Sequence, residues 1–368
     1  MSIKTTKSSR FSLEEPPIIT GLDFSTEEID RRRRQSPPKL LTLDIELSLR
    51  CNLRCKYCYS NAGTPLKNEL SLSEFCSTIN QASDLGAKII VIVGGGEPFC
   101  YPHLKELLEY IENIGLKSLI FTNLTLIDKK WASFLWDRQI GVVGKLNSFQ
   151  PQVHDFLTGT VGSFKKAFKS LEHLKAQGYS NQDLERPLLA LETVILQPNY
   201  SEIPKMWRYC RNNNIIPYFE MITEQGRMKQ NKQLLVDPHK VMELFQRLLV
   251  IDETEFGYTW IPHAPIVSYN CTRHYFASYL KVTGELTPCP GVDIPLGNVR
   301  TTPLKDILNC QEIRILRNIE KYIQGQCHNC KHSKRELPCY GCRGQAWQTT
   351  NDITAQDPDC CLYIDKIQ

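Results

Sequence analysis

The chain has 368 residues, 41% of them apolar, and a formal net charge of +4. This length and apolar content suffice for a full hydrophobic core, so we expect one large domain and one smaller one. The small positive excess predicts no broad surface for polyanions, which argues against nucleic acid as a partner. No apolar stretch approaches the roughly 20 residues of a membrane span, and residues 1–10 lack the apolar segment of a secretory signal. The sequence therefore predicts a cytoplasmic protein that does not bind a membrane.

Fifteen cysteines are many for a protein of that compartment, where they indicate metal binding or catalysis rather than disulfides. Three lie between positions 51 and 58 and nine lie between 271 and 361, whereas residues 101–270 contain only Cys210. Cysteines that ligate metal gather where the metal lies. We expect Cys76, Cys100 and Cys210, outside both groups, to pack as small hydrophobic side chains.

Residues 1–40 have the composition of a polar extension and contain the basic run Arg31–Arg34. Such a run either docks an acidic peptide or partner, or belongs to a solvated tail. The composition leaves both readings open.

From residue 41 onward, short apolar runs alternate with amphipathic stretches. The expected strands cover 41–49, 88–93, 117–122, 141–147, 188–196 and 215–221, and helical patterns lie near 71–85, 103–114, 128–137, 163–177, 201–213 and 238–251. Ser71 and Glu74 form a capping box at the start of the first of these helices. Six strand-helix units in succession predict an α/β fold with a parallel sheet, curled by right-handed crossovers into a partial (β/α)6, TIM-like barrel.

Cys51, Cys55 and Cys58 form a C-x3-C-x2-C motif directly after the first expected strand. Three thiolates can hold three irons of a 4Fe-4S cube and leave the fourth iron open. A structural zinc site or a redox Cys pair is the alternative. Gly94–Pro98 follows the second expected strand, and in barrels of this kind the loops after the strands share one rim, where the chemistry takes place.

Tyr57 stands just before the third cysteine, and Gly94–Pro98 ends in G-G-E-P. In both motifs the chain resembles the radical SAM enzymes. The resemblance implies a 4Fe-4S cluster whose open iron binds S-adenosylmethionine and cleaves it to a 5′-deoxyadenosyl radical, which abstracts hydrogen from a substrate.

The same resemblance implies a set of cofactor contacts. Leu124 stands where the family has the glycine of Thr-Asn-Gly, and neither the family nor the His154-Asp155 pair identifies a catalytic acid or base. The implied contacts are Gly94, Gly95, Gly96 and Glu97 at the methionine end, Tyr57 beside the adenine, Asn123 after the third strand, and Lys145, Asn147 and Ser148 near the ribose.

The C-terminal region has seven further thiols in paired groups, which is more than one zinc site needs. Together with Gly284–Cys289, Gly341–Gly344 and Asp357–Cys360, they resemble the SPASM extension of radical SAM enzymes. The resemblance implies a first auxiliary cluster at Cys271, Cys289 and Cys342 and a second at Cys327, Cys330, Cys339 and Cys360.

In the family pattern one more cysteine is common at the position of Ala277, so the resemblance implies only three protein ligands for the first auxiliary cluster. Its open iron then binds the substrate, or Cys310 or Cys361 supplies the fourth ligand. The expected domains are the extension 1–40, the radical SAM partial barrel 41–265 and the SPASM domain 266–368.

The resemblance implies an enzyme that modifies a ribosomally made peptide or protein, for example by backbone excision, cross-linking or epimerisation. Forty N-terminal residues are too few for a winged-helix leader-binding domain, so we expect a separate recognition protein or capture by the arginine-rich extension. An electron donor such as flavodoxin or ferredoxin completes the expected partners. The alternatives are a radical SAM oxidoreductase of a small molecule, such as a tetrapyrrole, amino sugar or alcohol, and a non-enzymatic metal scaffold.

Overall fold

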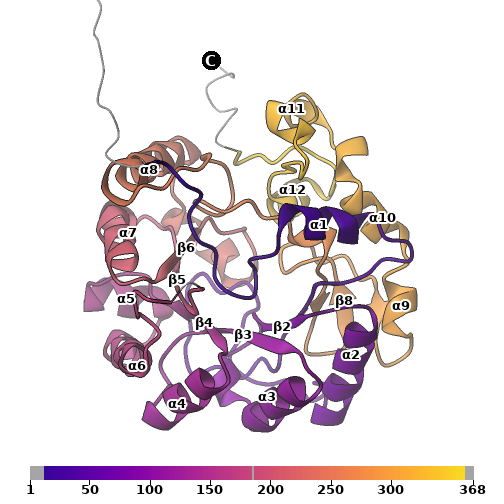
Figure 1. The fold of residues 1–368 in the computed structure, drawn as a ribbon, viewed down its shortest axis with the longest axis horizontal. Helices are drawn as coiled ribbons and strands as arrows, with labels where there is room; N and C mark the ends of the chain where they lie inside the picture. The colour runs from indigo at the N-terminus through magenta and orange to yellow at the C-terminus, as the bar shows by residue number, and fades with distance from the viewer. Residues whose placement is uncertain (1–11, 185, 361–368) are drawn as a thin grey trace, which may run out of the picture.

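The computed structural model describes residues 12–184 and 186–360, and a nine-stranded sheet organises them (Figure 1). The strand order is β6-β5-β4-β3-β2-β1-β7-β8-β9, and every pairing from β6 to β7 is parallel. All six predicted barrel strands are confirmed: β1 (Thr42–Ile45), β2 (Ile89–Ile92), β3 (Lys117–Thr122), β4 (Gly141–Lys145), β5 (Leu189–Val194) and β6 (Ile216–Glu220). Their apolar runs are buried, as a parallel sheet covered on both faces requires.

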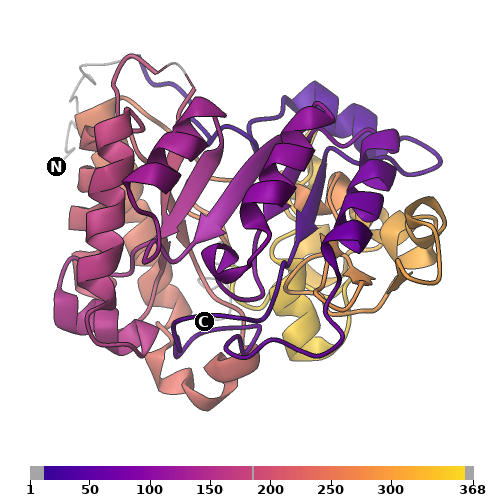
Figure 2. The same cartoon turned by 90° about the horizontal axis from the view of Figure 1, so that it is seen from below.

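Helices cover the outer face of this sheet and bury most of the apolar core against it (Figure 2). The six predicted helices are confirmed, and α5 is an addition: α2 (Leu72–Asp84), α3 (Leu104–Asn113), α4 (Lys129–Asp137), α5 (Pro151–Thr158), α6 (Ser163–Gln177), α7 (Ile203–Asn212) and α8 (Pro238–Ile251). The capping box of Ser71 and Glu74 forms at the start of α2 as predicted. Within residues 12–184 and 186–360, no helix is long and apolar enough to cross a membrane.

The Cys-rich C-terminal region joins the barrel through the sheet itself. Strand β7 (Tyr279–Leu280) pairs in parallel with β1, and β8 (Glu285–Thr287) and β9 (Gly297–Asn298) follow in antiparallel. This region therefore adds to the β1 edge of the barrel and not to the β6 edge. Its helices are short: α9 (Leu304–Ile307), α10 (Gln311–Arg317), α11 (Gly325–His328) and α12 (Arg343–Thr350).

The described part of the N-terminal extension is not a solvated tail, which corrects the expectation for residues 12–40. Helix α1 (Thr26–Arg33) lies beside the C-terminal region in Figure 1. Arg33 is buried there, donates to Glu320 at 2.9 Å and stacks 5.1 Å from the ring centroid of Tyr275. Arg34 pairs with Asp30 of the same helix. Arg33 is thus part of the folded core, because a buried guanidinium group requires acidic or aromatic partners. Arg31 and Arg34 stay exposed.

Candidate active site

One cavity of about 290 Å³ opens at the carboxyl ends of the barrel strands. Its wall includes the three thiols of the C-x3-C-x2-C motif and the glycines of the second motif. The C-terminal region supplies another part of the wall. Six cysteines from the two ends of the chain line this one cavity: Cys51, Cys55, Cys58, Cys271, Cys289 and Cys342.

The loop that carries the first thiol triad is held from two sides. Cys51 N donates to Gly63 O at 3.2 Å, and Lys56 N donates to Leu157 O of α5 at 2.9 Å. Burial raises the pKa of Cys51 to about 12 and that of Cys55 to about 11. Such thiols become thiolates at neutral pH when a metal supplies positive charge, so this donor set fits an iron-sulfur cluster. Across residues 12–184 and 186–360, no three or more His, Cys, Asp or Glu side chains are grouped to hold a single metal ion.

The glycines after β2 bring backbone close to the cavity. Gly94 has φ +80°, and a Cβ there would lie 2.1 Å from the hydroxyls of both Tyr59 and Tyr279. Gly96 approaches so closely that its Cβ would lie 2.0 Å from the carbonyl oxygen of Arg50. A side chain at either position would collide with its neighbours, so glycine is required for this wall shape.

Glu97 joins the loops after β2 and β3. Its buried carboxylate accepts from Thr122 Oγ1 and from Asn123 N, both at 2.7 Å. Burial raises the pKa of Glu97 to about 7. Leu124, which replaces the glycine of the related motif, nevertheless adopts φ +64°. The turn therefore keeps the left-handed backbone that a glycine would favour.

The remaining predicted cofactor residues divide into two groups. Tyr57 and Lys145 line the cavity, and the Lys145 ammonium lies 5.3 Å from the Tyr57 ring centroid. Asn147 and Ser148 are fully buried and are not among the residues that line the cavity. Asn147 Nδ2 donates to the Tyr57 hydroxyl at 2.5 Å, and Ser148 donates to Glu202. Asn147 and Ser148 therefore lie behind the residues that line the cavity.

A row of charged residues crosses three strands of the wall, and the sequence reasoning missed two of its members. Lys145 on β4 pairs in register with Glu192 on β5, with 2.7 Å between Lys145 Nζ and Glu192 Oε1. Glu220 on β6 lies two residues beyond Tyr218, the register partner of Glu192, so it faces the same side. Burial and the neighbouring Glu192 raise the pKa of Glu220 well above its usual range. The sequence did carry a signal for Glu192 and Glu220, because each is a charged residue in an otherwise apolar strand.

The seven C-terminal thiols expected to bind clusters lie in two different surroundings. Cys271, Cys289 and Cys342 all line the cavity. Burial raises the pKa of Cys289 and Cys342, and the charges of the neighbouring thiols raise it further. The second group lies away from the cavity. There Cys327 and Cys330 raise the pKa of Cys339, again after burial, and Cys360 is buried: the thiols of this second group are Cys327, Cys330, Cys339 and Cys360.

Neither candidate for an extra ligand of the first auxiliary group is placed there by the structure. Cys310 is the N-cap residue of α10 and is not among the residues lining the cavity. Cys361 lies outside the described residues. His154 and Asp155 belong to α5. His154 is buried, and the Asp155 carboxylate accepts hydrogen bonds from the first residues of α6, so both residues stabilise the fold.

Three further wall residues near the first auxiliary thiols were not singled out from the sequence. Arg273 pairs with the buried Asp44 of β1. His274 and Arg343 are 5% and 1% exposed. Burial and the guanidinium groups of Arg343 and Arg273 lower the pKa of His274 to about 3, so its imidazole is neutral at pH 7.

Two family models match the chain in the regions of these thiol groups. Residues 45–206 match the radical SAM superfamily, and residues 271–331 match the SPASM iron-sulfur cluster-binding domain. An Fe-coproporphyrin III synthase of Methanosarcina barkeri is 30% identical over 87% of this chain and 88% of its own length. The chain belongs to the radical SAM superfamily and carries a SPASM domain.

The names of other relatives of this radical SAM/SPASM enzyme indicate different reactions. An AdoMet-dependent heme synthase of Oleidesulfovibrio alaskensis is 25% identical over 92% of both chains. The antilisterial bacteriocin subtilosin biosynthesis protein AlbA of Bacillus subtilis is 26% identical over 74% of this chain and 60% of its own length. The resemblance found in the sequence is confirmed, including its similarity to peptide maturases, and the cofactors are 4Fe-4S clusters and S-adenosylmethionine.

Solved structures share the fold. Streptococcus suis SuiB bound to S-adenosylmethionine superposes with a TM-score of 0.68 at 19% identity, covering 91% of this chain and 80% of SuiB. SuiB has also been solved bound to its precursor peptide SuiA. The α/β partial barrel followed by a SPASM domain is therefore confirmed.

Proposed function

We propose that this radical SAM/SPASM enzyme abstracts a hydrogen atom from a ribosomally made peptide or protein and so modifies it. The observation that carries the proposal is the single cavity that joins the first thiol triad to Cys271, Cys289 and Cys342. A substrate held between them lies next to the cofactor on one side and next to an electron-accepting cluster on the other. The SuiB and AlbA relatives support a peptide as this substrate.

We assign the cofactor contacts to the wall. Cys51, Cys55 and Cys58 hold the SAM-binding cluster, and the glycine loop at 94–96 receives the methionine end of the cofactor. When bound, these groups supply the 5′-deoxyadenosyl radical. Tyr57 orients the adenine, and its hydroxyl is itself held by the amide of Asn147.

Glu97, Asn123 and Lys145 complete the cofactor contacts that face the cavity. Glu97 also positions Asn123, because its carboxylate accepts from Asn123 N and from Thr122 at the end of β3. Ser148 acts indirectly, through Glu202. The second auxiliary cluster belongs to the buried thiols Cys327, Cys330, Cys339 and Cys360.

Two of the cations in the wall are already paired with carboxylates. Lys145 is paired with Glu192, and Arg273 is paired with Asp44. Arg227 and Arg343 also line the cavity, and they donate to backbone carbonyls. The wall therefore has few cations for a substrate with several ionised carboxylates.

A second candidate is a radical SAM oxidoreductase that acts on a tetrapyrrole. The 30% identity to the Fe-coproporphyrin III synthase favours it. Arg343 also favours it, because two buried nitrogens of this side chain lack a hydrogen-bond acceptor and would suit one carboxylate. The proposed partners beyond the substrate are a leader-recognition protein and a flavodoxin or ferredoxin electron donor, in the cytoplasm.

The two candidates differ in one anaerobic experiment. The reconstituted enzyme, S-adenosylmethionine and dithionite are incubated with short peptides encoded beside the gene or with Fe-coproporphyrin III, and both substrate pools are analysed by mass spectrometry. We expect a mass change in a peptide and formation of 5′-deoxyadenosine, both lost in the Cys55→Ala variant. A change confined to Fe-coproporphyrin III would replace the peptide proposal with the second candidate.

A further inference from the structure

The first auxiliary thiol group has three cysteines for a cube of four irons. Cys271, Cys289 and Cys342 line the cavity together, and Ala277 stands six residues after Cys271, where the family resemblance implies a fourth thiol. Ala277 is buried in an apolar cluster and has no ligand atom. A 4Fe-4S cluster with one fewer thiolate either has an open iron or takes another donor from its surroundings.

His274 follows Cys271 by three residues and lines the same cavity as the three thiols. Its ring centroid is 5.1 Å from that of Tyr340, and Tyr340 in turn lies close enough to Cys271 and Cys289 for their charges to affect its pKa. Arg343, the residue that directly follows Cys342, lies close enough to His274 to lower the pKa of its imidazole. Tyr340 and Arg343 therefore place the imidazole on the part of the wall that carries the three thiols.

The imidazole has a nitrogen with no partner. His274 is 5% exposed, and its Nδ1 is buried without any hydrogen bond. A buried nitrogen without a hydrogen bond destabilises the fold, and native proteins retain such a group where it serves a ligand or a reaction. Histidine is also a frequent metal ligand and replaces cysteine in some iron-sulfur centres.

The other polar side chains of this part of the wall are poorer donors to iron. A guanidinium group has no lone pair to donate, which excludes Arg273 and Arg343. The Tyr340 hydroxyl is a neutral phenol, and burial and nearby charges raise its pKa well above the usual range. Glu220 also lines the cavity near Cys271, but its carboxyl group is hydrogen-bonded to Glu192, and burial raises its pKa well above the usual range. Of these side chains, His274 offers the lone pair best suited to iron.

We propose that the imidazole of His274 is the fourth protein ligand of the first auxiliary cluster, beside Cys271, Cys289 and Cys342. This inference rests on the proposed assignment of those three thiols to that cluster. A neutral imidazole in place of a thiolate reduces the negative charge of the cluster and raises its reduction potential. The cluster then accepts an electron from the cavity more readily than an all-cysteine cluster would.

The test is pulsed electron paramagnetic resonance of the reduced auxiliary clusters. The variant with Cys51→Ala, Cys55→Ala and Cys58→Ala lacks the SAM-binding cluster and simplifies the spectrum. In this background we expect a histidine nitrogen coupling that changes when the protein is grown on ¹⁵N-histidine. The coupling should disappear in His274→Cys, which retains a thiolate ligand, while the iron content stays the same and the reduction potential falls.

His332 provides the matched control, since its backbone N donates to Cys330 Sγ of the second group at 3.4 Å. The coupling should persist in His332→Ala. If the triple cysteine variant with His274 unchanged shows no histidine nitrogen coupling, the proposal is wrong. This outcome does not depend on how a His274 variant folds. The Cys289→Ala variant tests the assignment of the three thiols separately from the His274 ligand. If this variant loses no cluster signal, the thiol assignment is wrong, and the ligand proposal fails with it.

Discussion

At the scale of single residues, the glycine loop after β2 offers a matched pair of substitutions. Gly94 and Gly115 both have φ +80°, so alanine is strained to the same degree at either position. A Cβ at Gly94 would lie 2.1 Å from the hydroxyls of Tyr59 and Tyr279, whereas a Cβ at Gly115 would meet nothing within 4 Å. Any difference between the two variants therefore reports the crowded cavity wall and not backbone strain.

We expect Gly94→Ala to reduce the rate of S-adenosylmethionine cleavage by at least about tenfold, because about 1.4 kcal/mol of misplacement already costs that factor. Gly115→Ala should keep the cleavage rate and lose only about 1 kcal/mol of stability. The measurement is 5′-deoxyadenosine formed per enzyme with dithionite as reductant. Equal cleavage rates in the two variants would contradict a cofactor role for the loop.

Cys55 gives a second prediction at this scale. Replacement by alanine removes one of the three thiols proposed for the SAM-binding cluster, so Cys55→Ala should abolish cofactor cleavage. The auxiliary clusters, held by other thiols, should remain. Iron analysis and 5′-deoxyadenosine assays check both statements, and retained cleavage would show that Cys55 is not a cluster ligand.

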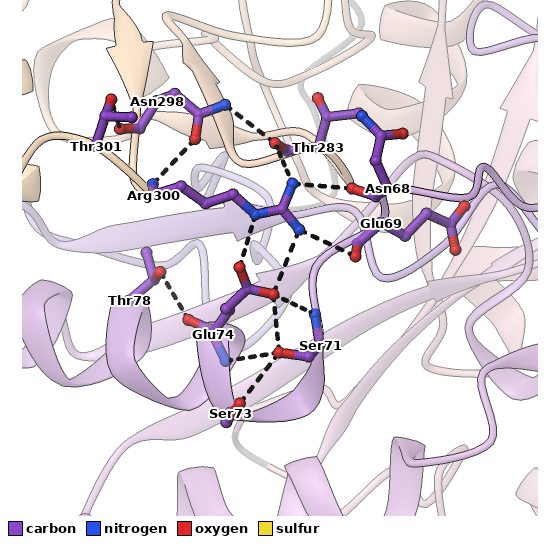
Figure 3. Close-up of polar contacts among 10 residues, drawn as sticks. All are labelled: Asn68, Glu69, Ser71, Ser73, Glu74, Thr78, Thr283, Asn298, Arg300 and Thr301. Carbon is purple, nitrogen blue, oxygen red and sulfur yellow. Dashed lines mark hydrogen bonds and ion pairs between the residues drawn. The ribbon is translucent and has the colours of Figure 1, made fainter.

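At the scale of elements, hydrogen bonds from Arg300 connect the hairpin of β8 and β9 to the start of α2 (Figure 3). Its Nε lies 2.6 Å from Glu74 Oε1, and its guanidinium also donates to the carbonyls of Asn68 at 3.0 Å and Glu69 at 3.1 Å. Glu74 already accepts from Ser71 N in the capping box. One arginine thus joins the C-terminal region to the cap of a barrel helix.

We expect Arg300→Met to lower the free energy of unfolding by about 1–2 kcal/mol, because a charged donor and three of its acceptors lose their partners. The control is Arg208→Met, which breaks a bidentate pair with Glu255 of similar exposure. That pair joins elements within the barrel and should contribute about 0–1 kcal/mol. Anaerobic urea unfolding measures both, and a smaller loss for Arg300 than for Arg208 would be inconsistent with the fastening role.

The same contact has a defined pH dependence. The hydrogen bond from Arg300, followed by the one from Ser71 N, lowers the pKa of Glu74 from 4.5 to about 2. Because the folded-state pKa lies below the unfolded one, this stabilisation is fully present above pH 4.5 and is lost as the pH falls toward 2. The stability difference between wild type and Glu74→Gln should therefore stay constant above about pH 5 and shrink as the pH falls from 4.5 toward 2. A difference that stays constant down to about pH 2 would contradict the lowered pKa.

At the scale of the whole molecule, three cubes predict about eleven to twelve irons per chain. Cys55→Ala should retain about eight of them, since two auxiliary clusters remain. Iron and sulfide analysis after anaerobic reconstitution measures this. A preparation that saturates at about four irons would eliminate the auxiliary clusters.

The shared cavity makes a further prediction about electron flow through the molecule. Cys289→Ala should leave S-adenosylmethionine cleavage intact and impair substrate turnover, because Cys289 lines the cavity beside Cys271 and Cys342 and is not one of the three early thiols. Cleavage is followed as 5′-deoxyadenosine, and turnover is followed as modified substrate. Normal turnover would reduce the first auxiliary site to a structural element.

The sequence by itself determined the features that depend on local pattern. The spacing of Cys51, Cys55 and Cys58, the glycine loop and the alternation of strands with helices follow from neighbours along the chain, and these elements are confirmed. The capping box at Ser71 also formed as predicted, because its two hydrogen bonds join residues three positions apart.

Only the tertiary structure decided which distant residues share a surface. Strand β7 has two residues, too few for a sequence pattern, yet its pairing with β1 attaches the C-terminal region to the barrel. Glu192 and Glu220 became neighbours through strand register, and Arg33 became buried through contact with Tyr275 and Glu320. Such contacts depend on the register and packing of segments far apart in the chain, which no local window of sequence contains.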